Sequence, residues 1–231
     1  MDADPAPRGR DLTRRLAAEG IGTAFLVIAV IGSGIMASRL TDDTALQLLA
    51  NAAATTGALI ALIWMFAAVS GAHFNPAVTL VGRLFGTITT GDAVAYTAAQ
   101  VVGGCVGAVI ANVMFELPAF EVSTHVRSSG ALWFSEIVAT IGLLLVIHGC
   151  VRSGRGDIVA VAVGVWIGGA YWFTSSTSFA NPAVTVARTL SNSFAGIAPS
   201  SAPTFIVMQV IGALAAVVLI RLIYPARLTV E

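Results

Sequence analysis

Lysine does not occur in this chain of 231 residues, and charged residues of every kind make up only 10% of it. A soluble domain carries about 25% charged residues, so this composition argues against a soluble globular protein. Twelve arginines balance twelve aspartates and glutamates, and the resulting net charge of zero gives no basic surface for nucleic acid. Two cysteines are too few for a disulfide framework or a cysteine-based metal site. The chain is instead 57% apolar, which is typical of a protein that lies in a membrane.

Six apolar segments are each long enough to cross a hydrocarbon core, which takes about 20 helical residues. They cover residues 17–38, 45–68, 91–116, 131–151, 158–176 and 203–224. The connections are short, so we expect a single channel domain at residues 13–231, preceded by a disordered cytoplasmic N-terminus at residues 1–12. No small-residue cleavage site separates that N-terminus from the first span, so we expect no cleaved signal peptide.

The arginines predict the orientation of these spans. If the N-terminus is cytoplasmic, nine arginines lie inside and three lie outside, as the positive-inside rule requires. The inner set is Arg8, Arg10, Arg14, Arg15, Arg83, Arg152, Arg155, Arg221 and Arg227, and the outer set is Arg39, Arg127 and Arg188. Both termini are therefore predicted to be cytoplasmic.

One pentapeptide occurs twice, as Asn75-Pro76-Ala77-Val78-Thr79 and as Asn181-Pro182-Ala183-Val184-Thr185. Asn followed by Pro starts helices, because Asn caps free amides and Pro fits the first helical position. The helices that follow extend only to about Phe85 and Leu190, which is roughly 15 Å each at 1.5 Å per residue. Two such half-helices end to end span one hydrocarbon core of about 30 Å.

The two halves of the chain repeat more than this motif. Glu19 and Glu136 open the first span of each half, and the sequence Gln100-Val-Val-Gly is echoed by Gln209-Val-Ile-Gly in the third span. The repeats cover about residues 13–116 and 131–224. Three spans per repeat require the second copy to be inverted, which brings the two half-helices together at the midplane beside a water-filled path.

The paired Asn-Pro-Ala motifs, with Ser70-Gly71-Ala72-His73-Phe74 before the first, resemble those of the aquaporin and aquaglyceroporin (major intrinsic protein) family. The resemblance implies an all-α membrane protein with six transmembrane helices, two re-entrant half-helices and an inverted internal repeat. It also implies passive transport with no cofactor and no metal, in a homotetramer in the inner (plasma) membrane. No catalytic triad or phosphate loop is recognisable, so we do not expect an enzyme.

The resemblance assigns roles to residues around the motifs. Asn75 and Asn181 are expected to cap their half-helices with the side-chain oxygen and to donate their amide groups into the lumen, where the positive helix ends repel cations. The expected acceptors for the solute are backbone carbonyls of Gly71, Ala72, His73, Phe74, Phe179 and Ala180. Glu19 and Glu136 are expected to accept hydrogen bonds from the re-entrant loops, although a proton-relay role would suit a coupled transporter. His73 lies near the predicted cytoplasmic mouth, which leaves pH gating open as an alternative to a purely backbone role.

The predicted selectivity filter departs from the family pattern. Most members carry Arg directly after the second Asn-Pro-Ala, whereas this chain has Val184. Ungapped spacing from the motifs places the other filter positions at Thr55, Gly169 and Ser178. None of these is aromatic or histidine, so we predict a constriction that is wide and uncharged. An aromatic residue of the run Tyr171-Trp172-Phe173 could nevertheless lean into the space.

Arg188 lies one helical turn beyond Val184. It is expected to sit in the outer vestibule, or else to replace part of the missing filter charge.

These features predict a passive channel for water and small neutral solutes, including glycerol-like polyols and metalloid hydroxides such as arsenite or methylated arsenicals. A wide filter of this kind is similar to that of bacterial members linked to arsenic resistance. The expected partners are the lipid bilayer, the solutes and further copies of the chain. Two alternatives stay open: an ion- or proton-coupled secondary transporter, which also uses inverted repeats and broken helices, and a closed, adhesion-type member with little flux.

Overall fold

The computed structural model describes residues 8–224, with side chains described from Asp11 onward, and all regular structure in this range is helical. The predicted disordered N-terminus needs correction. Residues 1–7 of that segment lie outside the described residues, but residues 8–12 form the start of the first helix. Arg227, which contributed to the predicted orientation, also lies outside the described residues.

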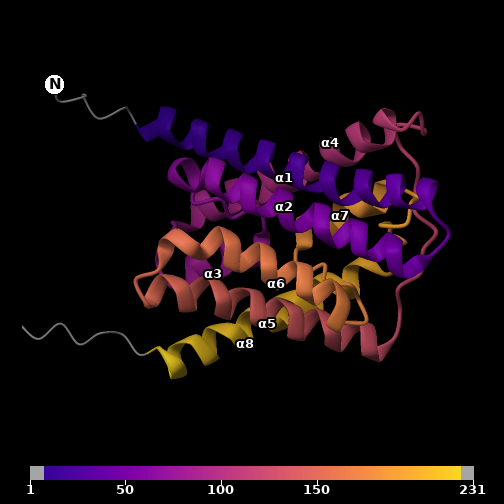
Figure 1. Ribbon diagram of the computed structural model, residues 1–231. Coiled ribbons are helices and arrows are strands. Elements are labelled where there is room, and N and C mark those ends of the chain that lie inside the picture. Colours follow the sequence, from indigo (N-terminus) through magenta and orange to yellow (C-terminus); the bar gives the residue numbers. More distant parts are fainter. Residues whose placement is uncertain (1–7, 225–231) are drawn as a thin grey trace, which may run out of the picture.

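Six helices within the described range are long and apolar enough to cross a membrane. They are α1 (Arg8–Leu40), α2 (Thr44–Ser70), α4 (Thr90–Met114), α5 (Gly130–Arg152), α6 (Val159–Phe173), which follows the short 3₁₀ turn η1 (Gly156–Ile158), and α8 (Ala202–Ile223). Each coincides with one of the six predicted spans. The start of α1 and the end of α8 lie at the same end of the molecule, here called the terminal side, and the opposite end is called the distal side (Figure 1).

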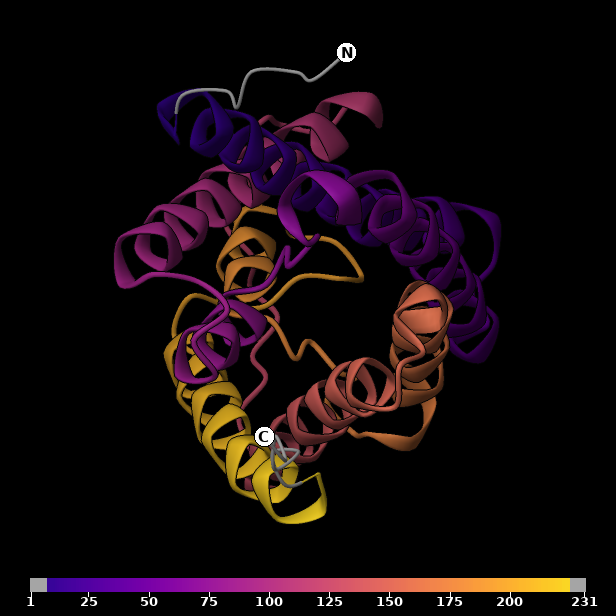
Figure 2. The ribbon, with the colours of Figure 1, turned by 90° about the vertical axis from the view of Figure 1, so that its left-hand side faces the viewer.

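Two short helices interrupt this pattern. They are α3 (Pro76–Leu84) and α7 (Pro182–Ala187), and α7 continues into a 3₁₀ turn, η2 (Arg188–Leu190). Both pack against α4 and α8. Seen along the long helices, α3 and α7 lie within the ring that the six long helices form (Figure 2).

Two glycines show why the equivalent helix pairs of the two repeats pack so closely. A Cβ atom added at Gly103 of α4 would lie 2.1 Å from the Gly20 carbonyl oxygen of α1. At the matching position of the second repeat, a Cβ at Gly212 of α8 would lie 2.8 Å from the Ile137 carbonyl oxygen of α5. Small residues allow membrane helices to approach backbone to backbone, so the repeated glycine fixes the α1–α4 and α5–α8 contacts.

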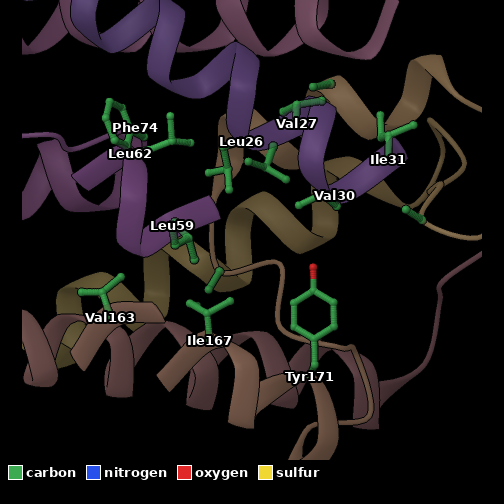
Figure 3. Packing of buried hydrophobic residues seen from close by; sticks show 14 of the residues in the cluster. Leu26, Val27, Val30, Ile31, Leu59, Leu62, Phe74, Val163, Ile167 and Tyr171 are labelled. Atoms are coloured by element: carbon green, nitrogen blue, oxygen red, sulfur yellow. The ribbon is translucent and has the colours of Figure 1, made fainter. Parts of the chain in front are cut away.

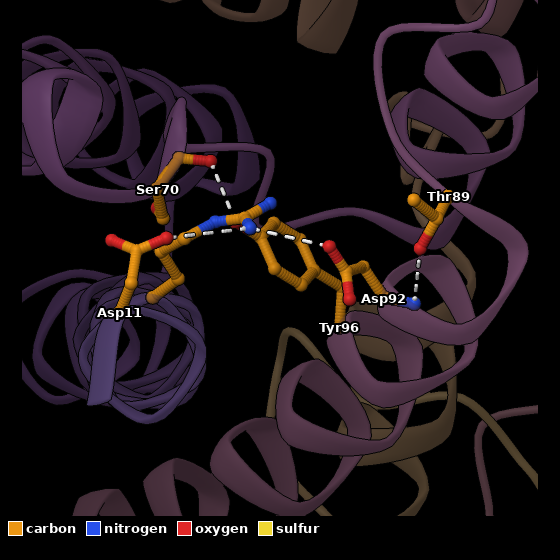
Figure 4. A network of polar contacts seen from close by, with 6 residues as sticks. Asp11, Ser70, Thr89, Asp92 and Tyr96 are labelled. Carbon is orange, nitrogen blue, oxygen red and sulfur yellow. Dashed lines mark hydrogen bonds and ion pairs between the residues drawn. The ribbon is translucent and has the colours of Figure 1, made fainter. Parts of the chain in front are cut away.

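A polar network on the terminal side ties α1, α2 and α4 together (Figure 4). Arg15 donates from Nε to the Tyr96 hydroxyl at 2.7 Å and from Nη1 to Asp92 at 3.2 Å. The Tyr96 hydroxyl in turn donates to the Ser70 carbonyl at 3.0 Å. Ser70 is the last residue of α2, so this network anchors the point where the chain turns into the first motif.

Candidate solute pathway

The chain approaches each motif through residues in a left-handed backbone conformation. The φ angles are +50° at Ala72 and +48° at Phe74 before the first motif, and +52° at Ser178 and +47° at Ala180 before the second. This conformation costs an L-residue roughly 1–2 kcal/mol. Interactions elsewhere must therefore hold these two approach segments, residues 70–74 and 176–180, and two buried carboxylates do so.

Glu19 of α1 holds the first approach segment. Its Oε1 accepts from the Ser70 hydroxyl at 2.6 Å and from the His73 amide at 2.9 Å. Its Oε2 accepts from the Phe74 amide at 2.7 Å and from the Gln100 side-chain amide at 2.8 Å. The carboxylate is fully buried and satisfied by four donors.

Glu136 of α5 repeats this arrangement for the second segment. Its Oε1 accepts from the Ser176 hydroxyl at 2.6 Å and from the Phe179 amide at 2.9 Å. Its Oε2 accepts from the Ala180 amide at 2.9 Å and from the Gln209 side-chain amide at 2.6 Å. The two glutamates thus perform the same structural task in the two halves.

Four partners of the glutamates were not assigned a role from the sequence. Ser70 and Ser176 each stand five residues before the motif asparagine, and this shared spacing was the available signal. Gln100 and Gln209 were recognised only as marks of the repeat. Each glutamine also donates to the threonine that ends its pentapeptide, Gln100 to Thr79 at 3.0 Å and Gln209 to Thr185 at 2.9 Å.

Asn75 and Asn181 cap their half-helices and also cross-link them. Asn75 Oδ1 accepts from the Ala77 amide at 2.8 Å, and Asn181 Oδ1 accepts from the Ala183 amide at 3.0 Å. The Asn75 amide group donates to the Ala180 carbonyl at 2.7 Å, and the Asn181 amide group donates to the Phe74 carbonyl at 2.8 Å. One N–H of each asparagine is therefore engaged, contrary to the expectation that the whole group faces the lumen, and the other N–H makes no hydrogen bond within the described residues.

A cavity of about 520 Å³ runs along the two motifs. Apolar side chains from several long helices line much of it, among them Leu59, Val163 and Ile167 (Figure 3). Of the predicted carbonyl residues, the following line the cavity: Gly71, Ala72, His73, Phe74 and Phe179. Ala180 is not among the described residues that line the cavity, and its carbonyl accepts from Asn75.

The cavity has a mixed apolar and polar wall where the filter was expected. Thr55, Ser178 and Val184 all line it, as predicted. Gly169 does not: it is exposed and lines a separate hollow between α5 and α6. Tyr171 is the residue of α6 that lines the cavity at this level, and its hydroxyl lies 3.2 Å from the Thr55 hydroxyl.

The register of α6 explains this correction. Ile167 and Tyr171 are four residues apart and share the helix face toward the cavity, whereas Gly169 lies between them on another face. The ungapped count back from Asn181 therefore reached the wrong face of the helix. Trp172 and Phe173 are 49% and 56% exposed, so of the aromatic run only Tyr171 points inward.

Arg188 lies in the cavity wall rather than in an open vestibule. Its side chain is only 2% exposed, and its guanidinium carbon lies 3.4 Å from the centre of the Phe179 ring. Its Nε donates to the Ala195 carbonyl. It lines the same cavity as Ser178 and Val184.

A second arginine reaches the same ring from the loop before α5. The guanidinium carbon of Arg127 lies 5.3 Å from the Phe179 ring centre, and its Nε donates to the Gly196 carbonyl at 2.9 Å. Burial lowers the pKa of Arg127 from its ordinary value, with the Glu136 charge acting in the opposite direction.

At the terminal side of the cavity, two histidines line the wall. His73 Nδ1 lies 3.0 Å from the Thr79 hydroxyl, within the network that Gln100 and Glu19 complete. His148 of α5 stacks against Phe85, with ring centres 4.9 Å apart.

Similar proteins share this architecture. A family model described as major intrinsic protein matches residues 8–178. Aquaglyceroporin AqpS of Rhizobium meliloti (strain 1021) is 50% identical over 218 residues, which cover 94% of this chain and 93% of that protein. Aquaporin TIP1-1 of Arabidopsis thaliana is 33% identical over 168 residues, which cover 68% of this chain and 66% of that protein. The X-ray structure of the aquaglyceroporin from Plasmodium falciparum matches with a TM-score of 0.67 at 21% identity, covering 90% of this chain and 95% of that one.

Six spans, two capped half-helices and a cavity along both motifs define a multi-pass membrane channel. The chain belongs to the major intrinsic protein family. It is a channel for water and small solutes, and it is not an enzyme.

Proposed function

We propose that this channel passively conducts neutral hydroxylated solutes larger than water: glycerol-like polyols, and metalloid hydroxides such as arsenite and methylated arsenicals. The observation that carries the proposal is the mixed wall at the constriction. Val184 offers an apolar surface there, while the paired hydroxyls of Thr55 and Tyr171 offer hydrogen bonds. A solute with hydroxyl groups on one side and carbon or methyl groups on the other fits both surfaces.

The rest of the wall supports the same class of solute. The cavity is lined by Leu59, Ile63, Val163 and Ile167. Such a wall makes favourable contacts with the apolar groups of a solute, but it cannot replace the water that an ion would lose on entry. Residues of the two approach segments line the same cavity on the side of the motifs. The resemblance of the filter to arsenic-linked members rests on Val184 in the place of the usual Arg, and Arg188 adds a guanidinium nearby.

Passive conduction is favoured over coupled transport by the state of the two glutamates. Glu19 and Glu136 are fully buried, each accepts four hydrogen bonds, and neither belongs to the cavity lining within the described residues. A proton relay needs a titratable group in the path. His73 and His148 do line the cavity, and they are the residues on which a coupled mechanism would have to depend.

The proposal includes the placement of the channel in its membrane. The terminal side faces the cytoplasm of the inner (plasma) membrane, because most of the arginines lie there. Residues 13–231 form one channel domain, and four copies assemble into a homotetramer. Large apolar side chains exposed on the long helices, such as Phe25, Phe134 and Leu222, serve lipid and subunit contacts.

Stopped-flow measurements on proteoliposomes test this function. Vesicles with and without the channel are shocked with glycerol or arsenite, and water flux is measured with an impermeant osmolyte. Flux of all three above the empty vesicles, not saturating at moderate concentration and unchanged by a protonophore or a sodium gradient, supports the proposal. Loss of solute flux when the proton gradient collapses would establish the coupled transporter instead.

A further inference from the structure

Arg188 is a buried cation whose charge has no anionic partner. Within the described residues its side chain makes one hydrogen bond, from Nε to the neutral Ala195 carbonyl, and its guanidinium lies against the Phe179 ring. Its two terminal amino groups have no protein acceptor in this range. A buried charge is costly unless it is paired and hydrogen-bonded, so these amino groups are available to a ligand in the cavity that Arg188 lines.

The surroundings of Arg188 carry an excess of positive charge. The charged side chains close enough to act on it are Arg127 and Glu136. Glu136 is committed to four donors of the second approach segment. In the described part of the chain the ion pairs all belong to Arg15, so neither Arg127 nor Arg188 has a carboxylate partner. Two guanidinium groups against one carboxylate leave one positive charge.

Ser178 supplies an independent observation at the same place. Its side chain is 3% exposed, its hydroxyl is buried without a hydrogen-bond partner, and it lines the same cavity. Ser178 precedes Phe179, the residue on which the Arg188 guanidinium rests. An unsatisfied buried hydroxyl costs about 1–3 kcal/mol. A ligand that accepts a hydrogen bond from it would recover this free energy.

We propose that Arg188 and Ser178 form a site for one small monovalent oxyanion at the distal constriction, and that an anion held there blocks the channel. Guanidinium N–H groups and a hydroxyl both donate, which is the pattern an oxyanion needs. One bound negative charge balances the local excess. The bound ion does not continue through the channel, because the apolar wall beyond the constriction offers no replacement for its partners.

Thermal unfolding of the purified full-length protein tests the binding itself. Nitrate is the probe, and it replaces gluconate, a much larger anion, at constant sodium and ionic strength. A ligand that binds the folded protein stabilises it by RT ln(1 + [L]/Kd), so we expect the Tm to rise with nitrate and, above the Kd, to increase with the logarithm of its concentration. The rise should disappear in Arg188→Gln and weaken in Ser178→Ala.

Arg39→Gln is the matched control. Arg39 also lies on the distal side, where it donates to the Phe115 carbonyl and stacks on the Phe115 ring outside the cavity lining. This variant should keep the full nitrate response. A response of equal size in the wild type and Arg188→Gln, or none in the wild type, would overturn the site. If Arg188→Gln does not fold, the comparison of Ser178→Ala with Arg39→Gln decides in the same way.

Flux measurements test the block, which rests on the proposed function. Nitrate on the distal side should abolish most glycerol flux in the wild type and in Arg39→Gln, and Ser178→Ala should need more nitrate for the same loss. A Tm response that depends on Arg188, with glycerol flux unchanged by nitrate, would overturn the block. A Tm response in a protein that conducts no glycerol at all would support the site while contradicting the proposed function, so the two failures are distinguishable.

Discussion

The hydroxyl groups of Thr55 and Tyr171 lie 3.2 Å apart, joining α2 to α6 in the wall of the cavity. Both side chains are buried, with 2% of each exposed. Figure 3 shows Tyr171 pointing from α6 toward Val30 of α1. The wall opposite the second motif is therefore an aromatic ring with a hydroxyl at its tip, rather than the open space that Gly169 would leave.

Removing the Tyr171 ring should widen the constriction. Tyr171→Ala is expected to raise the flux of methylated arsenicals relative to water, because the ring occupies the cavity wall. Tyr171→Phe keeps the ring but removes one hydroxyl, so it should lower glycerol flux relative to water with little change in size selection. Both ratios can be measured by stopped flow.

Gly169→Ala is the control for these variants. Gly169 faces the separate hollow, and an added Cβ would lie 3.7 Å from the nearest atom, in the Phe173 ring. The flux ratios should stay at wild-type values. A change in selectivity as large as that of Tyr171→Ala would mean that Gly169 lines the pore after all.

The midplane predictions concern Asn75 and Asn181. Asn75→Asp or Asn181→Asp should raise the cation conductance of planar bilayers, because a carboxylate replaces a donor beside the positive ends of the half-helices. Each substitution also removes a hydrogen bond that cross-links the two approach segments. Asn75→Asp removes the bond to the Ala180 carbonyl, and Asn181→Asp removes the bond to the Phe74 carbonyl. Unchanged conductance in both variants would show that these asparagines do not set the central barrier.

Sequence reasoning succeeded where a feature is local and failed where it depends on register. The six spans and the capping asparagines follow from runs of apolar residues and from Asn-Pro chemistry, which act within a few residues. Gly169 was misplaced because counting back from Asn181 assumes a loop of fixed length between α6 and the second motif. A shift of two residues turns a helix by more than half a turn, and Tyr171 takes the position.

Long-range hydrogen bonds were also beyond the sequence. Ser70 and Ser176 reach glutamates 51 and 40 residues away. Arg188 was placed one turn beyond Val184, but its burial depends on the Ala195 carbonyl and on the Phe179 ring, which only the folded loops bring to it.

Glu136→Gln should destabilise the fold. A glutamine side chain has one acceptor oxygen and one donor group, so two of the four donors around Glu136 would lose their acceptor. At about 1–3 kcal/mol for each unsatisfied buried group, the loss is roughly 2–6 kcal/mol. The Tm of the detergent-solubilised protein measures it. Asp42→Asn, on the exposed turn before α2, should leave the Tm unchanged; an equal effect of the two variants would contradict the supporting role of Glu136.

Gly103→Ala should also destabilise the protein, because the added Cβ would lie 2.1 Å from the Gly20 backbone oxygen, which cannot move without separating α1 from α4. Overpacking of this kind typically costs about 1–3 kcal/mol. Gly57→Ala on α2 is the matched control, since nothing lies within 4 Å of its added Cβ. The comparison of the two Tm values is decisive, because both variants make the same chemical change within a helix.

Val184→Arg tests the constriction itself. The new side chain would add a bulky fork of donors to a wall already shared by Thr55, Tyr171, Ser178 and Arg188. Glycerol and arsenite flux should fall several-fold, whereas water flux should fall less, because water still fits and the new donors replace part of its lost hydrogen bonding. Val184→Leu adds bulk without charge, so a smaller loss of glycerol flux in that variant would separate the two effects.

Arg188→Ala is the counterpart of Val184→Arg. If Val184 and Tyr171 set the size of the solute that passes, this variant should change glycerol and arsenite flux only slightly in the absence of small oxyanions. Arg188 lies in the cavity wall against Phe179, so the alternative outcome of removing its side chain is a wider pore. If Arg188→Ala opens the pore to larger solutes while Val184→Arg changes nothing, then Arg188 is the residue that selects the solute, and Val184 does not set the constriction.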